Sequence, residues 1–323
     1  LNANALGQKL LCALNQPYEL EGSPHHKTPS IGLTLFRDHE ERIEDILKRA
    51  DLAMYQSKAA GRNTVRFYDP SMQAVVMARS ALERDMREAV AEGQFVLYYQ
   101  PVVNAERCTV GHEALVRWRH PQRGMVSPGE FIPVAEQTGL IMPIGQWVLR
   151  TACEQLARWA THPATADLTI AVNLSARQLR HQEFAAEVLT ILDQTGARAE
   201  RLKLELTESL LLHDVEETIG KMQQLAARGI RFSLDDFGTG YSSLAYLKRL
   251  PLDQLKIDQS FVRDLLTDPN DAAIARTILQ LAQSMDLDVV AEGVEQEGQR
   301  QFLQALGCKG FQGYLFGRPG PLE

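Results

Sequence analysis

Residues 201–208 read RLKLELTE, an alternation of apolar and polar side chains that decides the fold. Successive side chains of a β-strand point to opposite faces of the sheet. One face of this strand therefore carries three leucines, Leu202, Leu204 and Leu206. The opposite face carries three polar residues, Lys203, Glu205 and Thr207. We expect the leucine face to pack on helices and the polar face to point into the interior of a closed sheet.

Seven further strand-like runs occur from residue 95 onward: FVLYYQPVV, HEALVRW, LTIAVNLS, IRFSLDDF, QLKIDQSF, LDVVAEGVE and CKGFQGYLF. Amphipathic helical patterns separate most of them, at residues 132–160, 182–195, 214–228, 271–285 and 297–306. Eight strands with interleaved helices over about 240 residues are typical of a TIM (β/α)8 barrel. Only a short polar turn joins the first two runs, whereas a parallel crossover needs about a dozen residues or more. We therefore predict an α/β fold, a modified TIM (β/α)8 barrel with an antiparallel first strand.

Six polar side chains lie on the inward faces of these strands, near the strands' C-terminal ends: Glu113, Asn173, Glu205, Asp235, Lys256 and Glu292. Barrel enzymes place their chemistry at that end. Isolated carboxylates in a protein interior are very costly unless they are paired or metal-bound, and one lysine does not neutralise four of them. A donor set of oxygen atoms without convergent His or Cys favours Mg²⁺ or Mn²⁺ over Zn²⁺. The pattern therefore predicts a divalent-metal site.

The composition excludes several classes of protein. The chain has 323 residues, with 34 Lys and Arg against 41 Asp and Glu and a net charge of −7. We expect no DNA or RNA polymer as a partner, because such proteins usually carry a basic surface. No uncharged apolar stretch reaches the roughly 20 residues of a membrane-spanning helix, so no membrane contact is expected within this chain. The four scattered cysteines are typical of free thiols, which favours a cytoplasmic location, either alone or as the cytoplasmic part of a longer, membrane-anchored sensor.

The first part of the chain has a different organisation. Residues 1–69 combine helical patterns at 2–16 and 43–61 with short strand-like runs, which predicts a mixed α/β segment. Asp69-Pro70-Ser71 is typical of a helix start, and Gly93 of a helix end. We expect residues 70–93 to form a connecting helix and residues 80–323 to contain the barrel.

Seven motifs in order resemble those of a known family: EALVR at 113–117, NLS at 173–175, ELTE at 205–208, DDFGTGY at 235–241, LKID at 255–258, AEGVE at 291–295 and QGY at 312–314. Together they are similar to the EAL domain, the cyclic-di-GMP phosphodiesterase family of bacterial signalling. Residues 1–69 resemble the C-terminal portion of a GGDEF (diguanylate cyclase) domain. No Gly-Gly acidic turn occurs in the chain, so this portion lacks the active-site motif and is not expected to make cyclic di-GMP.

The resemblance implies hydrolysis of cyclic di-GMP to linear pGpG with two Mg²⁺ or Mn²⁺ ions. One ion would be held by Glu113, Asn173, Glu205 and Asp235. The other would be held by Asp235, Asp236 and Glu292, so that Asp235 bridges the pair. Two neighbouring cations of this kind hold a phosphate, activate a water molecule and stabilise the attacking and leaving oxygens.

The resemblance also implies roles for residues around the metals. Glu292 is expected to act as general base or only as a metal ligand, Lys256 to contact the attacking water or the phosphate, and Glu295 to support the second metal. The expected substrate-binding residues are Gln100, Leu115, Arg117 and Gln312, with Arg117 on a phosphate and the two glutamines at the guanine end. Glu208 would brace the loop at residues 235–241, through which a homodimer is expected to form.

Two other functions are compatible with part of this pattern. A catalytically inert cyclic-di-GMP receptor would share the fold, but inert relatives usually lack one or more metal ligands, and here none is missing. Barrels with carboxylate-bound Mg²⁺ and a lysine also enolise carboxylic acids. The adjacent Asp235 and Asp236 argue against that chemistry, because neighbouring carboxylates suit two neighbouring cations.

Overall fold

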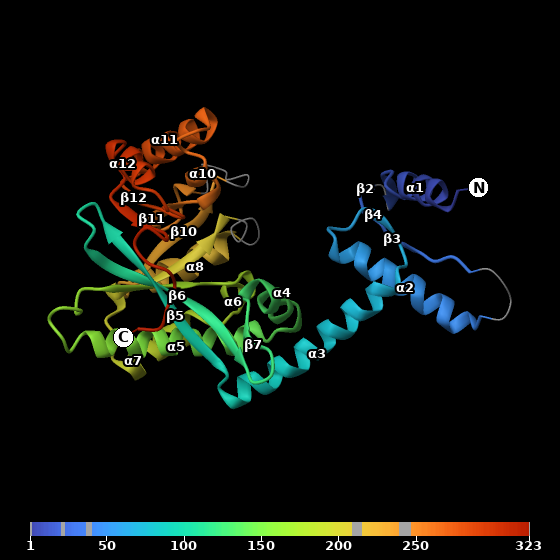
Figure 1. The fold of residues 1–323 in the computed structure, drawn as a ribbon, viewed down its shortest axis with the longest axis horizontal. Helices are drawn as coiled ribbons and strands as arrows, with labels where there is room; N and C mark the ends of the chain where they lie inside the picture. The colour runs from blue at the N-terminus through green and yellow to red at the C-terminus, as the bar shows by residue number, and fades with distance from the viewer. Residues whose placement is uncertain (1, 21–22, 37–40, 209–214, 239–246, 323) are drawn as a thin grey trace. The chain divides into compact units, whose positions relative to one another are not determined.

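A closed eight-stranded sheet forms the larger of two units in the computed structural model of the protein (Figure 1). The structure describes residues 2–20, 23–36, 41–208, 215–238 and 247–322. The chain divides by its contacts into a smaller unit, Leu1–Asp85, and a larger unit, Met86–Glu323. Each unit has its own sheet and helices, and each is described by itself.

The smaller unit is mixed α/β. Its strands form two pairs, β1 (Tyr18–Leu20) antiparallel to β2 (Ser23–His25) and β3 (Ser30–Leu33) parallel to β4 (Thr64–Phe67). Two helices pack on β3 and β4, α1 (Ala3–Leu14) and α2 (Ile43–Ala59). Gly32 permits this packing, because a Cβ atom there would lie 2.1 Å from the Ala50 carbonyl oxygen on α2. A long helix, α3 (Pro70–Glu92), then leads to the barrel.

The barrel strands are β5 (Phe95–Asn104), β6 (Thr109–His120), β8 (Thr169–Asn173), β9 (Leu202–Thr207), β10 (Arg231–Phe237), β11 (Gln254–Ile257), β12 (Asp288–Ala291) and β13 (Gly310–Gln312). Their order around the sheet is β5-β13-β12-β11-β10-β9-β8-β6, and pairing of β5 with β6 closes it. β5 runs antiparallel to both neighbours, whereas the other barrel pairs are parallel. The prediction of a modified TIM barrel with an antiparallel first strand is confirmed. A short strand, β7 (Gly124–Val126), adds to β6.

The helices of the larger unit lie between the strands in sequence: α4 (Pro128–Thr138), α5 (Ile141–Trp159), α6 (Ala176–Arg180), α7 (Phe184–Thr195), η1 (Ala199–Arg201), α8 (Val215–Ala226), α10 (Gln259–Arg263), α11 (Pro269–Ser284) and α12 (Glu297–Ala305). One prediction was wrong here, since residues 132–160 contain two helices rather than one. Gly139 ends α4 in the left-handed conformation, with φ of 86°, a common helix terminus that glycine adopts without steric cost.

Apolar side chains fill the space between the sheet and the helices. The three leucines of β9 are fully buried, with 0% of their surface exposed, and so are Phe232 and Leu234 of β10. Near the start of the barrel, Trp118 packs with Phe95 and Phe131 at ring-centroid distances of 5.9 Å. The polar face of each strand is thereby directed into the barrel, as the alternation of RLKLELTE predicts.

The four cysteines are free thiols, of which Cys153 and Cys308 are buried. Burial raises the pKa of both buried thiols to about 12, so they are unreactive near neutral pH. A search of the described residues finds no helix that combines the length and the apolar character needed to cross a bilayer.

Gly313, directly after β13, provides a test of how tightly the barrel closes. A Cβ atom at this position would lie 2.1 Å from the Val294 carbonyl oxygen and 2.3 Å from its nitrogen. We expect Gly313→Ala to lower the free energy of unfolding by about 2 kcal/mol or more, because the backbone of two segments must separate. Urea unfolding curves measure this change.

Gly220 of α8 provides the matched control. Nothing lies within 4 Å of a Cβ atom there, and alanine is the better helix former by about 0.8–1.0 kcal/mol. Gly220→Ala should therefore leave the protein as stable or slightly more stable. A Gly313→Ala variant that unfolds at the same urea concentration as the wild type would show that the two segments have more room than the structure gives them.

Candidate active site

Lys256 of β11 lies at the centre of the barrel's polar interior, with 1% of its surface exposed. Its Nζ atom lies 2.9 Å from Glu205 Oε2 and 3.5 Å from both Glu113 Oε2 and Asp235 Oδ1. The same atom contacts Glu292 Oε1. Carboxylates from β6, β9, β10 and the residue after β12 therefore meet on one ammonium group.

Strand register explains why these groups lie at the same depth in the barrel. Asn173 at the end of β8 pairs in register with Glu205 of β9. Glu205 in turn pairs with Ser233 of β10, two residues before Asp235 and on the same face. Asn173 also donates its Nδ2 hydrogen to Glu113 Oε1 at 2.6 Å. The structure thus brings together the six inward-facing residues that the alternation predicted, Glu113, Asn173, Glu205, Asp235, Lys256 and Glu292.

A cavity of about 250 Å³ opens above this cluster. It is lined by Gln100, Glu113, Leu115, Asp235, Gln259, Glu292, Gly293, Glu295, Gln312, Gly313, Tyr314 and Pro319. Gln312 Nε2 donates to Glu113 Oε2 at 2.5 Å and to Gln100 Oε1 at 3.1 Å, so the two glutamines are linked to the carboxylate cluster. Gln259, Tyr314 and Pro319 were not among the predicted site residues. Of these, only Tyr314 stood in a recognised motif, QGY.

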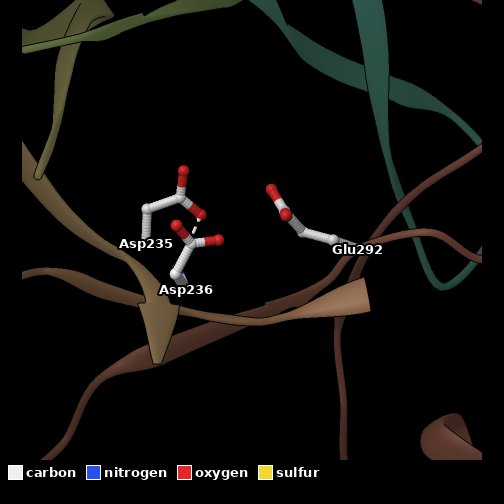
Figure 2. Close-up of side chains that lie close together, drawn as sticks. All are labelled: Asp235, Asp236 and Glu292. Carbon is white, nitrogen blue, oxygen red and sulfur yellow. Dashed lines mark hydrogen bonds between the residues drawn. The ribbon is translucent and has the colours of Figure 1, made fainter. Parts of the chain in front are cut away.

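Asp235, Asp236 and Glu292 form an acidic group that could hold a metal ion. One oxygen atom from each lies within 4.8 Å of the others, and Figure 2 shows Glu292 facing the two aspartates. Strict alternation would send Asp236 to the face opposite Asp235. Instead Asp236 has a φ of 54°, and the pairing of β10 with β11 shifts its register between Leu234 and Phe237. This irregular backbone turns both carboxylates toward Glu292.

The pKa values of the cluster reflect burial and mutual repulsion. Burial, with repulsion from Asp235 and Glu113, outweighs the attraction of Lys256 and raises the pKa of Glu292 to about 8. Burial also raises the pKa of Glu205 well above its usual range, and repulsion among the carboxylates adds to the effect. At Glu113 burial is outweighed by Lys256 and the hydrogen bonds from Gln312 and Asn173, so its pKa is lowered.

Asp236 has a neighbour that the sequence reasoning did not assign to the site. Its pKa is raised to about 6 by burial, by Asp235 and by Asp258. Asp258 caps α10 by accepting the Ser260 N–H at 3.0 Å. Its position two residues after Lys256, on the same face of the strand, was a signal that could have identified it.

The donor set fits hard divalent cations. The cluster supplies carboxylate oxygens and one amide side chain, the ligands that Mg²⁺ and Mn²⁺ prefer. Lys256 supplies one positive charge against Glu113, Glu205, Asp235 and Glu292. The buried carboxylates can therefore be fully charged only when additional cations are bound.

Arg117 lies apart from this cluster. Its guanidinium carbon lies 5.7 Å from the centre of the Tyr98 ring. Arg117 lines a separate, mainly apolar cavity of about 310 Å³, which Leu115 and Asn173 also line. A role for Arg117 in binding a phosphate therefore requires a ligand that extends from one cavity toward the other.

Glu208 and Glu295 lie at the edge of the site. Glu208 is 6% exposed, and its Oε2 accepts the Gly238 N–H at 3.3 Å. This contact reaches the start of the 235–241 loop, and residues 239–241 fall outside the described residues. Glu295 lines the 250 Å³ cavity, and its N–H donates to Gln299 Oε1 at 2.9 Å. The Glu208 side chain thus holds backbone near the cluster, whereas the backbone of Glu295 is itself held by the Gln299 side chain.

Comparisons with known proteins point to one family. Residues 83–319 match the model of the EAL domain, and residues 1–64 match that of the diguanylate cyclase GGDEF domain. The bifunctional diguanylate cyclase/cyclic di-GMP phosphodiesterase MucR of Pseudomonas aeruginosa is 44% identical, over 100% of this chain and 47% of its own length. The cyclic di-GMP phosphodiesterase PdeR of Escherichia coli is 37% identical, over 98% of this chain and 48% of its own length. The chain spans about half the length of these curated relatives.

Solved structures agree with this family. A structure described as the PaMucR phosphodiesterase in complex with c-di-GMP is 48% identical and has a TM-score of 0.72. The match covers 75% of this chain and 98% of the solved one. The EAL domain of Mycobacterium smegmatis DcpA is 36% identical, with a TM-score of 0.59, over 70% of this chain and 92% of the solved one.

The raised pKa of Glu292 predicts how the stability of the metal-free protein depends on pH. Its value of about 8 in the folded state exceeds the ordinary 4.5, so the folded protein binds this proton more tightly than the unfolded chain does. The contribution to stability is complete below pH 4.5 and is lost as the pH rises through about 8. We expect the free energy of unfolding in EDTA to fall by on the order of 1–3 kcal/mol over this interval.

Urea unfolding in EDTA at a series of pH values tests this expectation. Glu292→Gln should reduce the slope and leave the contributions of Glu205 and Asp236, whose raised pKa values act in the same direction. Glu295→Gln is the matched control, because Glu295 lines the same cavity without contacting Lys256, and it should keep the wild-type slope. Equal slopes in the wild type and in Glu292→Gln would contradict the prediction.

Proposed function

The chain belongs to the EAL domain family, and on that premise we propose that it hydrolyses cyclic di-GMP to linear pGpG by a two-metal mechanism. The observation that carries the proposal is the grouping of Asp235, Asp236 and Glu292 within 4.8 Å, next to the carboxylates around Lys256. Relatives named as cyclic di-GMP phosphodiesterases support the substrate. The complete set of oxygen ligands supports catalysis rather than binding alone.

The proposed mechanism divides the cluster between two Mg²⁺ or Mn²⁺ ions. Glu113, Asn173, Glu205 and Asp235 would hold one ion. Asp235, Asp236 and Glu292 would hold the other. When bound, the pair supplies a water molecule of lowered pKa and neutralises charge on the scissile phosphate.

The remaining steps fall to residues of the chain. Lys256 donates hydrogen bonds to the attacking water or to the phosphate, as the one cationic group within the cluster. Glu292 accepts the proton of the water or serves only as a ligand, and Glu295 supports the surroundings of the second metal. The buried Oε1 of Gln312 has no hydrogen-bond partner among the described residues, which suits it to accept an N–H of guanine, with Gln100 and Leu115 lining the same cavity.

Arg117 and Glu208 complete the proposal at its edges. Arg117 binds the second phosphate of an extended ligand, from its position beside the 310 Å³ cavity. Glu208 holds the start of the 235–241 loop through Gly238, and this loop forms a homodimer contact. We assign the reaction to the cytoplasm, where the four free thiols would remain reduced.

Product analysis tests the proposed reaction directly. Purified protein incubated with cyclic di-GMP should form pGpG when Mg²⁺ or Mn²⁺ is present. It should form no pGpG with EDTA, because the negatively charged carboxylates would repel the phosphate without two bound metal ions. Separation of the nucleotides by chromatography gives the readout. A nucleotide that binds but stays intact with every metal would make the protein a receptor instead.

Asp235→Asn tests the bridging role of this carboxylate. The substitution preserves shape but removes one charge shared by both metals, and we expect the rate of pGpG formation to fall below a tenth of the wild-type rate. Asp264→Asn is the control, since the side chain of Asp264 is about half exposed and its carboxylate pairs with its neighbour Arg263 at 3.0 Å. It should keep full activity. An Asp235→Asn variant with a tenth of the wild-type rate or more would contradict the two-metal assignment.

A further inference from the structure

The ammonium group of Lys256 occupies the position where the proposed metal ligands converge. Its contacts are with Glu113 Oε2, Glu205 Oε2, Asp235 Oδ1 and Glu292 Oε1. All four residues belong to the proposed metal-ligand set. A carboxylate oxygen that accepts a hydrogen bond from an ammonium group along one lone pair is less available to a cation on the same side, so the lysine and the metals compete for these oxygens.

Burial makes this competition strong. Lys256 is 1% exposed and Glu205 is 3% exposed, so water does not solvate either charge in place of its partner. A buried charge whose partner is removed is strongly destabilising, because it is left uncompensated and away from water. The lysine is therefore the counter-ion that allows several carboxylates to remain in the barrel when no cation is bound.

We infer that Lys256 substitutes for the metal ions in the metal-free protein, and that a divalent cation binds by displacing its Nζ atom from the carboxylates. The inference rests on the proposed metal dependence of the site. Metal binding is then an exchange of one internal cation for external ones. The free energy needed to displace the lysine lowers the apparent affinity for the metal. The same reduction occurs whenever only part of the protein population is in the state that can bind a ligand.

This exchange predicts opposite effects of a Lys256 substitution on the stability of the metal-free protein and on its affinity for metal. Removal of the lysine should lower the free energy of unfolding of the metal-free protein. At the same time it should increase the affinity for divalent cations. A residue that only contacts the attacking water or the phosphate would leave metal affinity unchanged in the absence of nucleotide.

Lys203 provides a matched control for the general effect of charge. It lies on β9, two residues from Glu205 and on the same inward face. Its Nζ donates to Gln254 Oε1 at 2.6 Å rather than to a carboxylate. Lys203→Met and Lys256→Met therefore each remove one positive charge from the barrel interior, but only Lys256→Met frees the carboxylate oxygens.

The experiment is calorimetric titration of Mn²⁺ into the full chain after metals and chelator have been removed, without nucleotide. We expect Lys256→Met to bind Mn²⁺ at least about tenfold more tightly than the wild type, which corresponds to about 1.4 kcal/mol. Lys203→Met should change the dissociation constant less than about threefold, or about 0.7 kcal/mol. Equal affinity in the two variants, or weaker binding in Lys256→Met, would overturn the inference.

Crystal structures of the wild-type protein with EDTA and with Mn²⁺ give a second measurement that does not depend on a variant that folds. Lys256 Nζ should contact the carboxylates in the first and lie beyond hydrogen-bond distance of at least two of them in the second. Bound Mn²⁺ with all four contacts intact would overturn the inference. A protein that exchanges Lys256 for Mn²⁺ but leaves cyclic di-GMP intact would support it and overturn the proposed function.

Discussion

The structure of the larger unit depends on neutralising the carboxylates that lie inside its closed sheet. Glu113, Glu205, Asp235 and Glu292 come from separate strands or strand ends, and in the absence of added cations they depend on Lys256 for positive charge. The leucines on the outer face of β9 are fully buried and fix the register that holds Glu205 at the level of the lysine. The apolar packing outside the sheet and the charge inside it thus both follow from the alternation of side chains along each strand. A shift of one residue in strand register would place the charged side chains outside and the apolar ones inside.

The fold and much of the site could be predicted from the sequence because period-two alternation survives in most barrel strands. Glu205, Lys256 and Asp235 follow that period, and their convergence needed only the closure of the sheet. Asp236 does not follow it. Its positive φ and the register shift beside it depend on how β10 pairs with β11, a tertiary property that alternation does not encode, so only the resemblance to a family motif brought Asp236 into the predicted site.

Other features escaped prediction for similar reasons. The break between α4 and α5 rests on Gly139, which lies in a stretch whose apolar spacing continues through the turn. Gln259 begins α10, where the period of the preceding strand ends, and Pro319 lies after the last predicted strand-like run. Arg117 shares the inward face of β6 with Glu113 and is paired with Val96 of β5, yet its guanidinium stacks over Tyr98, because a long side chain can reach a neighbour other than the one its strand face suggests.

The reversed direction of β5 also determines where the chain enters the barrel. Phe95 pairs with Trp118, so β5 begins at the rim that carries the candidate site, whereas the first strand of an all-parallel barrel begins at the opposite rim. Gln100, which lines the cavity, lies five positions further along β5. The C-terminal segment holds the same strand, since Tyr99 and Gly320 exchange both of their backbone hydrogen bonds. The end of α3 is therefore joined to the cavity through one strand, because only Gly93 and Gln94 separate Glu92 from the strand that carries Gln100.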